Sequence, residues 1–251
     1  MDKNFTEIDL KLKINQRLFP YKNSREKNMG YDLSLTTADG HTLEAYSAMP
    51  DGEPKAGMVI IQEIFGVNED IRETVDNFSK QGYHAIAPAL FDRSESNVVL
   101  GFDEEGMTKG IELKNNLNWD DVIKDVNSAI EHVKTAGNVG IVGFCMGGSV
   151  AWFAASRCPV QAAICYYGGD INANRSSESP SCPVMFHWGA EDQGIPLEGV
   201  KEVESEHPDQ ESFIYDGAGH GFSCSRRGSY HEESAKTAMK RTLEFAAHNL
   251  F

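Results

Sequence analysis

The chain has 251 residues, of which 23 are Lys or Arg and 38 are Asp or Glu, so its formal net charge is 23 − 38 = −15. This length suits one α/β domain whose core needs no disulfide bonds. The acidic balance argues against a protein that binds nucleic acid or an anionic membrane surface, because both need a basic face. The N-terminal residues mix charges and lack the apolar segment of a signal peptide, and no apolar run is long enough to span a bilayer.

The cysteines favour a reducing compartment and argue against a metal site. Their number is odd, and none of their spacings is the paired C-x-x-C of a zinc site. We therefore expect free thiols, a cytoplasmic protein, and neither a metal nor an organic cofactor. The five positions are Cys145, Cys158, Cys165, Cys182 and Cys224.

Residues 1–30 are polar and are expected to form an N-terminal extension of a single catalytic domain over residues 31–251. Apolar and polar residues alternate near the start, which allows a short edge strand over Ile8, Leu10, Leu12 and Ile14. A hairpin signal, Ala38-Asp39-Gly40, then separates two alternating segments.

Hydrophobic periodicity predicts an alternating series of strands and helices. Strands are predicted at 31–37, 42–48, 58–61, 83–87, 139–144, 161–166, 182–187 and 211–215. Helices are predicted at 68–81 with Asn68 as N-cap, at 119–135, from 146, at 198–205 and at 232–248. The stretch 93–118 contains three glycines and is predicted to be irregular; it is a possible lid. The alternation predicts a mostly parallel sheet with helices on both faces.

Cys145 lies in the block 143–148, Gly-Phe-Cys-Met-Gly-Gly, between a predicted strand and a predicted helix. This is the G-x-C-x-G form of the nucleophile elbow, a sharp turn whose flanking glycines avoid clashes. The helix N-terminus favours the thiolate, and the Met146 N–H can donate to a developing oxyanion. The other four cysteines lack this context and are interpreted as structural.

Two further polar residues follow strand ends in the order that an α/β hydrolase requires. His220 lies between glycines after strand 211–215, where a general base can reach the nucleophile. Asp192 follows strand 182–187 and would orient that base, with Glu191 as the neighbouring alternative. Among the other histidines, His187 is the main rival as base. Ligands of an open parallel sheet bind at these carboxyl ends.

Glu63 follows the apolar segment 58–61, where a buried carboxylate needs a partner. It is either one member of a salt bridge or a partner of the Cys145 thiol. By analogy with the elbow design, the Ile64 N–H would be the second oxyanion donor. The segment Glu206-His207-Pro208-Asp209 offers another possibility, because it is similar to the acid–base pair of class I glutamine amidotransferases.

Five blocks in order resemble the dienelactone hydrolase family of the α/β-hydrolase superfamily, over residues 30–250. They lie at 62–68, 82–91, 143–148, 189–192 and 217–222. The resemblance implies an α/β-hydrolase fold and a triad of Cys145, His220 and Asp192. It implies a glutamate, Glu63, that holds the resting cysteine as an unreactive thiol, and oxyanion donors at Ile64 and Met146. It also implies hydrolysis of a cyclic enol-lactone to maleylacetate through an acyl-enzyme.

The resemblance implies as well that Arg93 binds a substrate carboxylate, and we expect Phe65 and Phe222 to contact the substrate. The family's second arginine lies four residues after the histidine, where this chain has Cys224; Arg226 and Arg227 are the nearest arginines. The sequence therefore predicts a cysteine-dependent lactone or ester hydrolase with a small-molecule substrate. A glutamine amidotransferase-type enzyme and a non-catalytic binding protein of the same fold are the alternatives.

Overall fold

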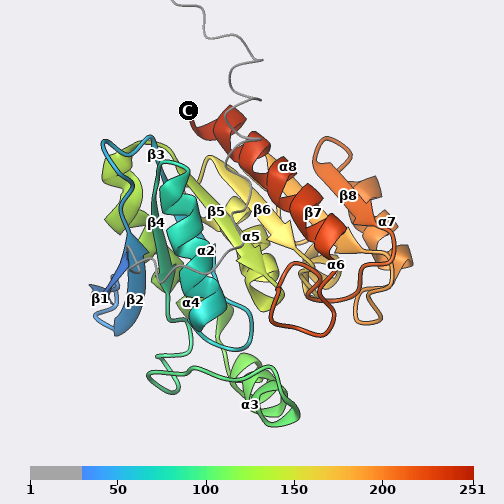
Figure 1. Ribbon diagram of the computed structural model, residues 1–251, viewed down its shortest axis with the longest axis horizontal. Coiled ribbons are helices and arrows are strands. Elements are labelled where there is room, and N and C mark those ends of the chain that lie inside the picture. Colours follow the sequence, from blue (N-terminus) through green and yellow to red (C-terminus); the bar gives the residue numbers. More distant parts are fainter. Residues whose placement is uncertain (1–29) are drawn as a thin grey trace, which may run out of the picture.

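The computed structural model describes residues 30–251, which contain one eight-stranded sheet of order β1-β2-β4-β3-β5-β6-β7-β8 (Figure 1). The edge strand considered at residues 8–14 lies outside the described residues. The strands are β1 (Gly30–Thr36), β2 (Thr42–Ala48), β3 (Ala56–Ile61), β4 (Tyr83–Pro88), β5 (Val139–Phe144), β6 (Ala162–Tyr166), β7 (Val184–Gly189) and β8 (Glu211–Tyr215).

The sheet is antiparallel at one edge and parallel elsewhere. β2 pairs antiparallel with β1 and β4, whereas every pair from β4 through β3 to β8 is parallel. All residues of β3 and β5 are buried, as continuous apolar strands in the middle of a parallel sheet require. The predicted α/β-hydrolase architecture is confirmed.

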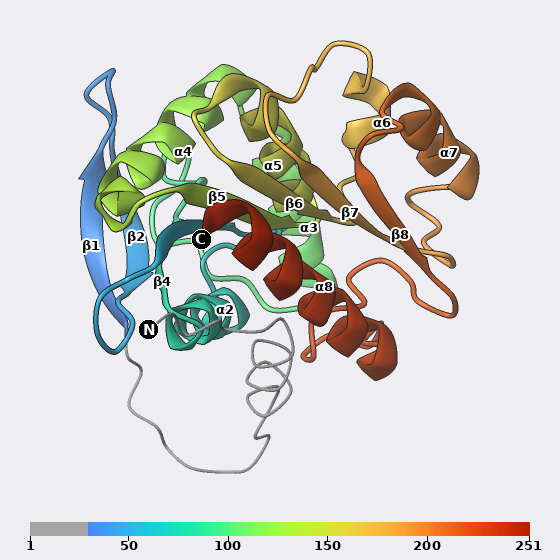
Figure 2. The same ribbon diagram turned by 90° about the horizontal axis from the view of Figure 1, so that it is seen from above.

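Helices cover both faces of the sheet. Figure 2 shows α4 and α5 on one face and α2 and α8 on the other. The helices are α2 (Glu69–Lys80), α3 (Glu104–Asn115), α4 (Trp119–Val133), α5 (Met146–Arg157), α6 (Ile171–Asn174), α7 (Leu197–Glu206) and α8 (Glu232–Leu250), with a 3-10 turn, η1 (Lys134–Ala136). The predicted N-cap is present, because the Asn68 side chain accepts a hydrogen bond from the Ile71 N–H.

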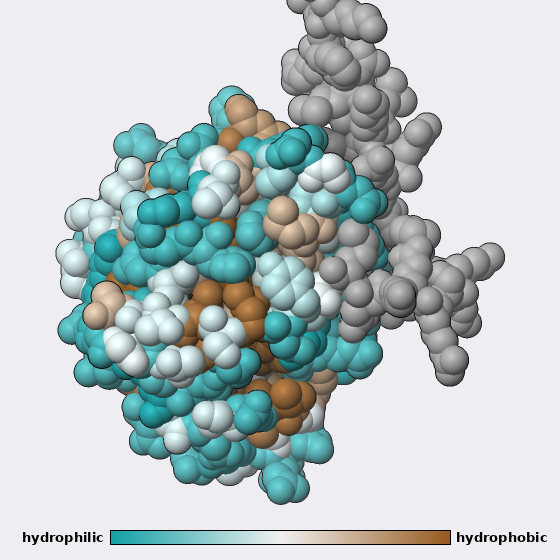
Figure 3. Space-filling model, turned by 90° about the vertical axis from the view of Figure 1, so that its left-hand side faces the viewer, coloured by the Kyte–Doolittle hydropathy of each residue, from teal (hydrophilic) through white to brown (hydrophobic). Residues whose placement is uncertain are grey.

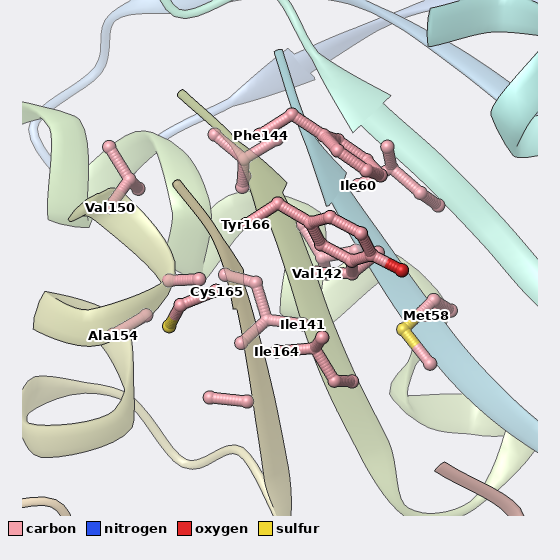
Figure 4. Packing of buried hydrophobic residues seen from close by; sticks show 14 of the residues in the cluster. Met58, Ile60, Ile141, Val142, Phe144, Val150, Ala154, Ile164, Cys165 and Tyr166 are labelled. Atoms are coloured by element: carbon pink, nitrogen blue, oxygen red, sulfur yellow. The ribbon is translucent and has the colours of Figure 1, made fainter. Parts of the chain in front are cut away.

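The helix behind the predicted nucleophile is buried almost all round. Ten consecutive residues from the start of α5 are buried, which makes this helix part of the core rather than an amphipathic cover. Figure 4 shows Val150 and Ala154 of α5 facing Cys165 of β6, while Tyr166 points to the opposite face and packs against Phe144. The carboxyl ends of β5 and β6 are therefore fixed from both faces of the sheet.

The prediction that residues 93–118 are irregular was wrong for α3. Two glycines lower the helix propensity of this segment, which is why its pattern did not predict a helix. Both glycines are buried, and each allows a close backbone approach: a Cβ on Gly106 would lie 2.1 Å from the Gly101 carbonyl oxygen. Packing of the helix thus determines the conformation here, against the local preference.

The outer surface of the β1 edge is mainly polar. Figure 3 shows this face as largely hydrophilic, with apolar residues in separate patches. In the part of the chain that the structure describes, no helix is both long and apolar enough to cross a membrane.

Candidate active site

Cys145 occupies the turn between β5 and α5 in a left-handed conformation with φ of 55°. For a residue other than glycine this conformation costs about 1–3 kcal/mol and persists only where the surroundings enforce it. Here the glycines allow it, because a Cβ on Gly143 would lie 1.8 Å from the Gly147 carbonyl oxygen. The Cys145 N–H also donates to the Tyr166 carbonyl at 3.0 Å. The sulfur is thus presented, half-buried, at the carboxyl edge of the sheet.

His220 bridges the two other residues of the predicted triad. Its Nδ1 lies 2.8 Å from Oδ2 of Asp192, and its Nε2 lies 3.1 Å from Sγ of Cys145. The Asp192 side chain is almost fully buried, and its other oxygen accepts the Gly194 N–H at 2.9 Å. The neighbouring Glu191 is exposed. The structure therefore brings Cys145, His220 and Asp192 together in the predicted order.

The electrostatic surroundings of His220 favour its protonated form. Burial disfavours the imidazolium, but the hydrogen bonds to Asp192 and Cys145 outweigh burial and raise the pKa of His220 to about 10. The ring is 30% exposed and packs edge-on against Tyr167, with 5.1 Å between ring centroids. A protonated ring next to a sulfur can hold a thiolate and can later donate a proton.

Glu63 lies in this group of residues, paired with Arg227, one of the two arginines nearest the position of the family's second arginine. Arg227 Nη1 donates to Glu63 Oε1 at 3.1 Å, and the two side chains are 12% and 4% exposed. Burial raises the pKa of the Glu63 carboxyl, and the charges of Arg227 and His220 counteract this only in part. Within residues 30–251, no hydrogen bond joins Glu63 to Cys145. Of the two roles considered for Glu63, the observed one is a salt bridge.

The two predicted oxyanion donors lie in the turn after β5 and in the loop after β3. Met146 is the first residue of α5, so its N–H has no acceptor within the helix. Ile64 and Phe65 lie in the loop after β3, which Gln62 braces by accepting the Leu90 N–H at 3.2 Å. The Phe65 ring lies 5.5 Å from the Arg227 guanidinium carbon, so it borders the charged pair.

Arg93 lies elsewhere, bound by acidic side chains. Its Nε and Nη2 form a bidentate pair with Asp125 of α4 at 2.8–3.0 Å, and Nη2 also reaches Asp39 at 3.2 Å. Among the described residues, no contact joins Arg93 to Cys145 or His220. The Nε and Nη2 groups of Arg93 are engaged by these two carboxylates, and its binding of a substrate carboxylate stays a prediction. Arg227 is the arginine next to the triad.

Phe222 supports the histidine loop from inside the core. It is 0% exposed and packs against Tyr167 and Tyr215. We therefore replace the expected substrate contact with a packing role. Tyr167 was missed by the sequence reasoning, although it follows strand β6 as the other site residues follow their strands. Its φ of 37° is a second strained position of the site.

The rival histidines are engaged in other contacts. His207 ends α7, packs on Trp152 and bonds through Nε2 to the Arg175 carbonyl at 2.9 Å. His207 lies just before the start of β8, at the amino ends of the parallel strands, whereas Cys145 and His220 lie at their carboxyl ends. His187 is buried inside β7, hydrogen-bonded to Tyr215 and Thr242. The described residues contain no group of His, Cys, Asp and Glu side chains that could hold a metal ion.

Comparison with known proteins gives one consistent family. The model of the dienelactone hydrolase family matches residues 43–250. Carboxymethylenebutenolidases of Pseudomonas putida and Pseudomonas knackmussii are each 31% identical over 224 residues, covering 86% of this chain and 95% of theirs. A crystal structure from Klebsiella pneumoniae, assigned to the dienelactone hydrolases, has a TM-score of 0.74 and 29% identity, and covers 87% of this chain and 98% of that one. A dienelactone hydrolase-like promiscuous phosphotriesterase from metagenomic libraries shares the fold at 17% identity, with a TM-score of 0.70 and coverage of 89% of this chain and 100% of that one.

Proposed function

Because the chain belongs to the dienelactone hydrolase family, we propose that it hydrolyses a lactone or carboxylic ester with Cys145 as nucleophile. The observation that carries this proposal is the hydrogen-bonded line from Asp192 through His220 to Cys145. Such a line activates a weak nucleophile, because the histidine takes its proton and the carboxylate stabilises the resulting imidazolium.

In the first half of the proposed reaction, Cys145 is acylated. Sγ attacks the substrate carbonyl carbon as a thiolate, after its proton has moved to Nε2 of His220 and made that ring the imidazolium. The carbonyl oxygen becomes negative in the tetrahedral intermediate and accepts hydrogen bonds from the Ile64 and Met146 N–H groups. The C–O bond then breaks, the leaving oxygen takes the proton from His220, and a thioester remains on Cys145. When a lactone ring opens, both fragments stay joined in this thioester.

In the second half, water releases the acid. His220 accepts a proton from the water as the water oxygen attacks the thioester carbonyl. The second tetrahedral intermediate collapses by breaking the C–S bond, and the proton on His220 returns to the sulfur. The product is a carboxylic acid, and Cys145 is restored.

We propose that the substrate carries a free carboxylate that binds to Arg227. A protein with a net charge of −15 repels an anion at long range, so affinity must come from a local cation. Arg227 is a largely buried cation beside the triad, and Glu63 already occupies one of its donors. A substrate carboxylate would compete with Glu63 for this guanidinium. Displacement of Glu63 by the substrate would change the charge beside Cys145 at the moment when the nucleophile is needed.

We further propose that residues 31–251 act as a single catalytic domain in the cytoplasm. All five cysteines lie in the described part of the chain, and each is a free thiol. Free thiols persist in reducing compartments. The partner implied is a small lactone or ester, and the chemistry above uses only groups of the protein and water.

The test compares Cys145→Ala with Cys182→Ala on an activated aryl ester and on an enol-lactone. Cys182 is a nearly buried cysteine that no triad residue contacts, so its substitution controls for the general loss of a thiol. We expect kcat/KM to fall by about 10³-fold or more in Cys145→Ala alone. Release of ammonia from glutamine without ester hydrolysis would favour the glutamine amidotransferase instead, and binding without turnover would favour a non-catalytic protein.

A further inference from the structure

The segment 98–115, which includes α3, is docked on the 62–67 loop that carries Ile64. Gly66 and Val99 form an antiparallel bridge, and the Leu100 N–H donates to the Phe65 carbonyl at 3.0 Å. The Phe65 and Phe102 rings meet edge-to-face at 4.7 Å. Three different contacts therefore hold the 62–67 loop from the side of α3.

Within α3, the approach to Ile64 is made by Gly110 in the middle of the helix. A Cβ at this position would lie 2.3 Å from the Ile64 carbonyl oxygen and 3.1 Å from the Ile64 Cβ. Glycine inside a helix costs about 1 kcal/mol relative to alanine. Its presence at a buried helical position is explained by this approach, which no other residue allows.

The far end of α3 is fixed as well. Lys114 forms an ion pair with Asp170 at 2.9 Å, in the loop after β6. The Asp170 N–H donates in turn to the Ser149 hydroxyl of α5 at 3.0 Å. The helix thus bridges two loops at the carboxyl edge of the sheet, and its position is set from both ends.

We propose that Gly110 is a positioning residue for hydrolysis, because the α3 backbone packed through it holds Ile64 with its N–H directed at the substrate carbonyl oxygen. The catalytic part of this inference rests on the proposed function, while the contact itself does not. A methyl group at position 110 would have to move from 2.3 Å to the ordinary contact distance of 3.4 Å, which displaces Ile64 or α3 by about 1 Å. A displacement of this size in an oxyanion hole costs roughly 10- to 100-fold in rate.

The test compares Gly110→Ala with Gly199→Ala, a substitution within helix α7 (Leu197–Glu206). Both substitutions add a methyl group to a helical glycine, but at position 199 it meets the Asn172 side chain at 2.7 Å and not the 62–67 loop. We expect kcat on an aryl ester to fall at least about tenfold in Gly110→Ala with KM within about threefold, and to stay within about threefold in Gly199→Ala. Alkylation of Cys145 by iodoacetamide should be unchanged in both variants. Equal losses of kcat in both variants, or full kcat in Gly110→Ala, would overturn the proposal.

Backbone hydrogen exchange over residues 62–67 provides a readout that needs no turnover. We expect faster exchange there in Gly110→Ala than in the wild type and Gly199→Ala; unchanged exchange would contradict the positioning role. If the wild type hydrolysed no ester, the proposed function and the catalytic role of Gly110 would both be wrong. Hydrogen exchange would still decide whether α3 holds the 62–67 loop in place.

Should Gly110→Ala fail to fold, Phe102→Ala removes the ring contact with Phe65 without a steric clash. It should change kcat and exchange in the same direction by a smaller factor. Wild-type kcat and wild-type exchange in Phe102→Ala would then contradict the proposal.

Discussion

Arg227 donates through Nη1 to Oε1 of Glu63 at 3.1 Å, forming a largely buried ion pair next to the Cys145–His220–Asp192 line. A buried charge is tolerated when its partner is in place and becomes costly when the partner is removed. The pair therefore gives the site a cation that a substrate anion can reach only by competing with Glu63.

Replacing Arg227 tests this cation. In Arg227→Met we expect KM for an ester with a free carboxylate to rise about tenfold or more, because a charge-assisted hydrogen bond is lost. KM for a neutral ester of similar size should change less than about threefold. Arg226→Met is the matched control, since Arg226 pairs with Glu69 and Glu73 of α2 instead. Equal changes in KM for both esters would show that Arg227 does not bind the substrate carboxylate.

Replacing Glu63 tests its control of the thiol. Glu63→Gln keeps the shape of the side chain but removes a negative charge that opposes thiolate formation nearby. We expect iodoacetamide to alkylate Cys145 faster at acidic and neutral pH, and KM for a carboxylated ester to fall. The measurement is the alkylation rate of Cys145 as a function of pH, with the labelled peptide identified by mass spectrometry. If the alkylation rate depended on pH as it does in the wild type, Glu63 would not control the Cys145 thiol.

The pH dependence of the triad follows from the raised pKa of His220, about 10. A pKa raised in the folded state gives stability that is present below the unfolded value of about 6.5 and is lost as pH rises towards 10. We expect the free energy of unfolding to decline over this range. In Asp192→Asn the decline should start at lower pH, because a hydrogen bond that raises the pKa is weakened. If stability declined from the same alkaline pH in the wild type and in Asp192→Asn, this account would be contradicted.

His187 should reduce stability in acid. Burial lowers the pKa of His187 to about 3. Because this pKa is depressed, the unfolded chain binds the proton first, and stability present above pH 6.5 is lost as pH falls towards 3. The slope due to one group is at most about 1.4 kcal/mol per pH unit. In His187→Gln we expect a smaller slope of the free energy of unfolding between pH 6 and 4, as measured by urea titration; a slope equal to the wild type would contradict the assignment.

Much of the fold followed from periodicity and turn residues. The strands at 42–48, 139–144 and 211–215 were predicted at their observed bounds, because each is a short apolar or alternating segment between clear breaks. β7 begins and ends two residues later than predicted. Its last residues are held by β8, where Trp188 donates to Ser212, a contact that no local pattern indicates.

The sequence predicts the site residues that follow strand ends in a fixed order. It does not predict the residues that long-range packing brings to the site. Cys145, Asp192 and His220 each lie just beyond a strand end, so their meeting follows from a parallel sheet. Arg227 lies seven residues after His220, and successive turns from Gly221 (φ 77°) through Cys224 bring it back to Glu63. Likewise, the role of α3 depends on a backbone contact between Gly110 and Ile64.

The central claim is that Cys145 carries the acyl group during turnover. Rapid acid quenching of the wild type mixed with 4-nitrophenyl acetate, followed by peptide mass spectrometry, measures this directly. We predict an acetyl group on the peptide that contains Cys145, and a longer-lived adduct in His220→Ala, where water is no longer activated. An acetyl group on another residue, or full hydrolysis by Cys145→Ala, would contradict the account.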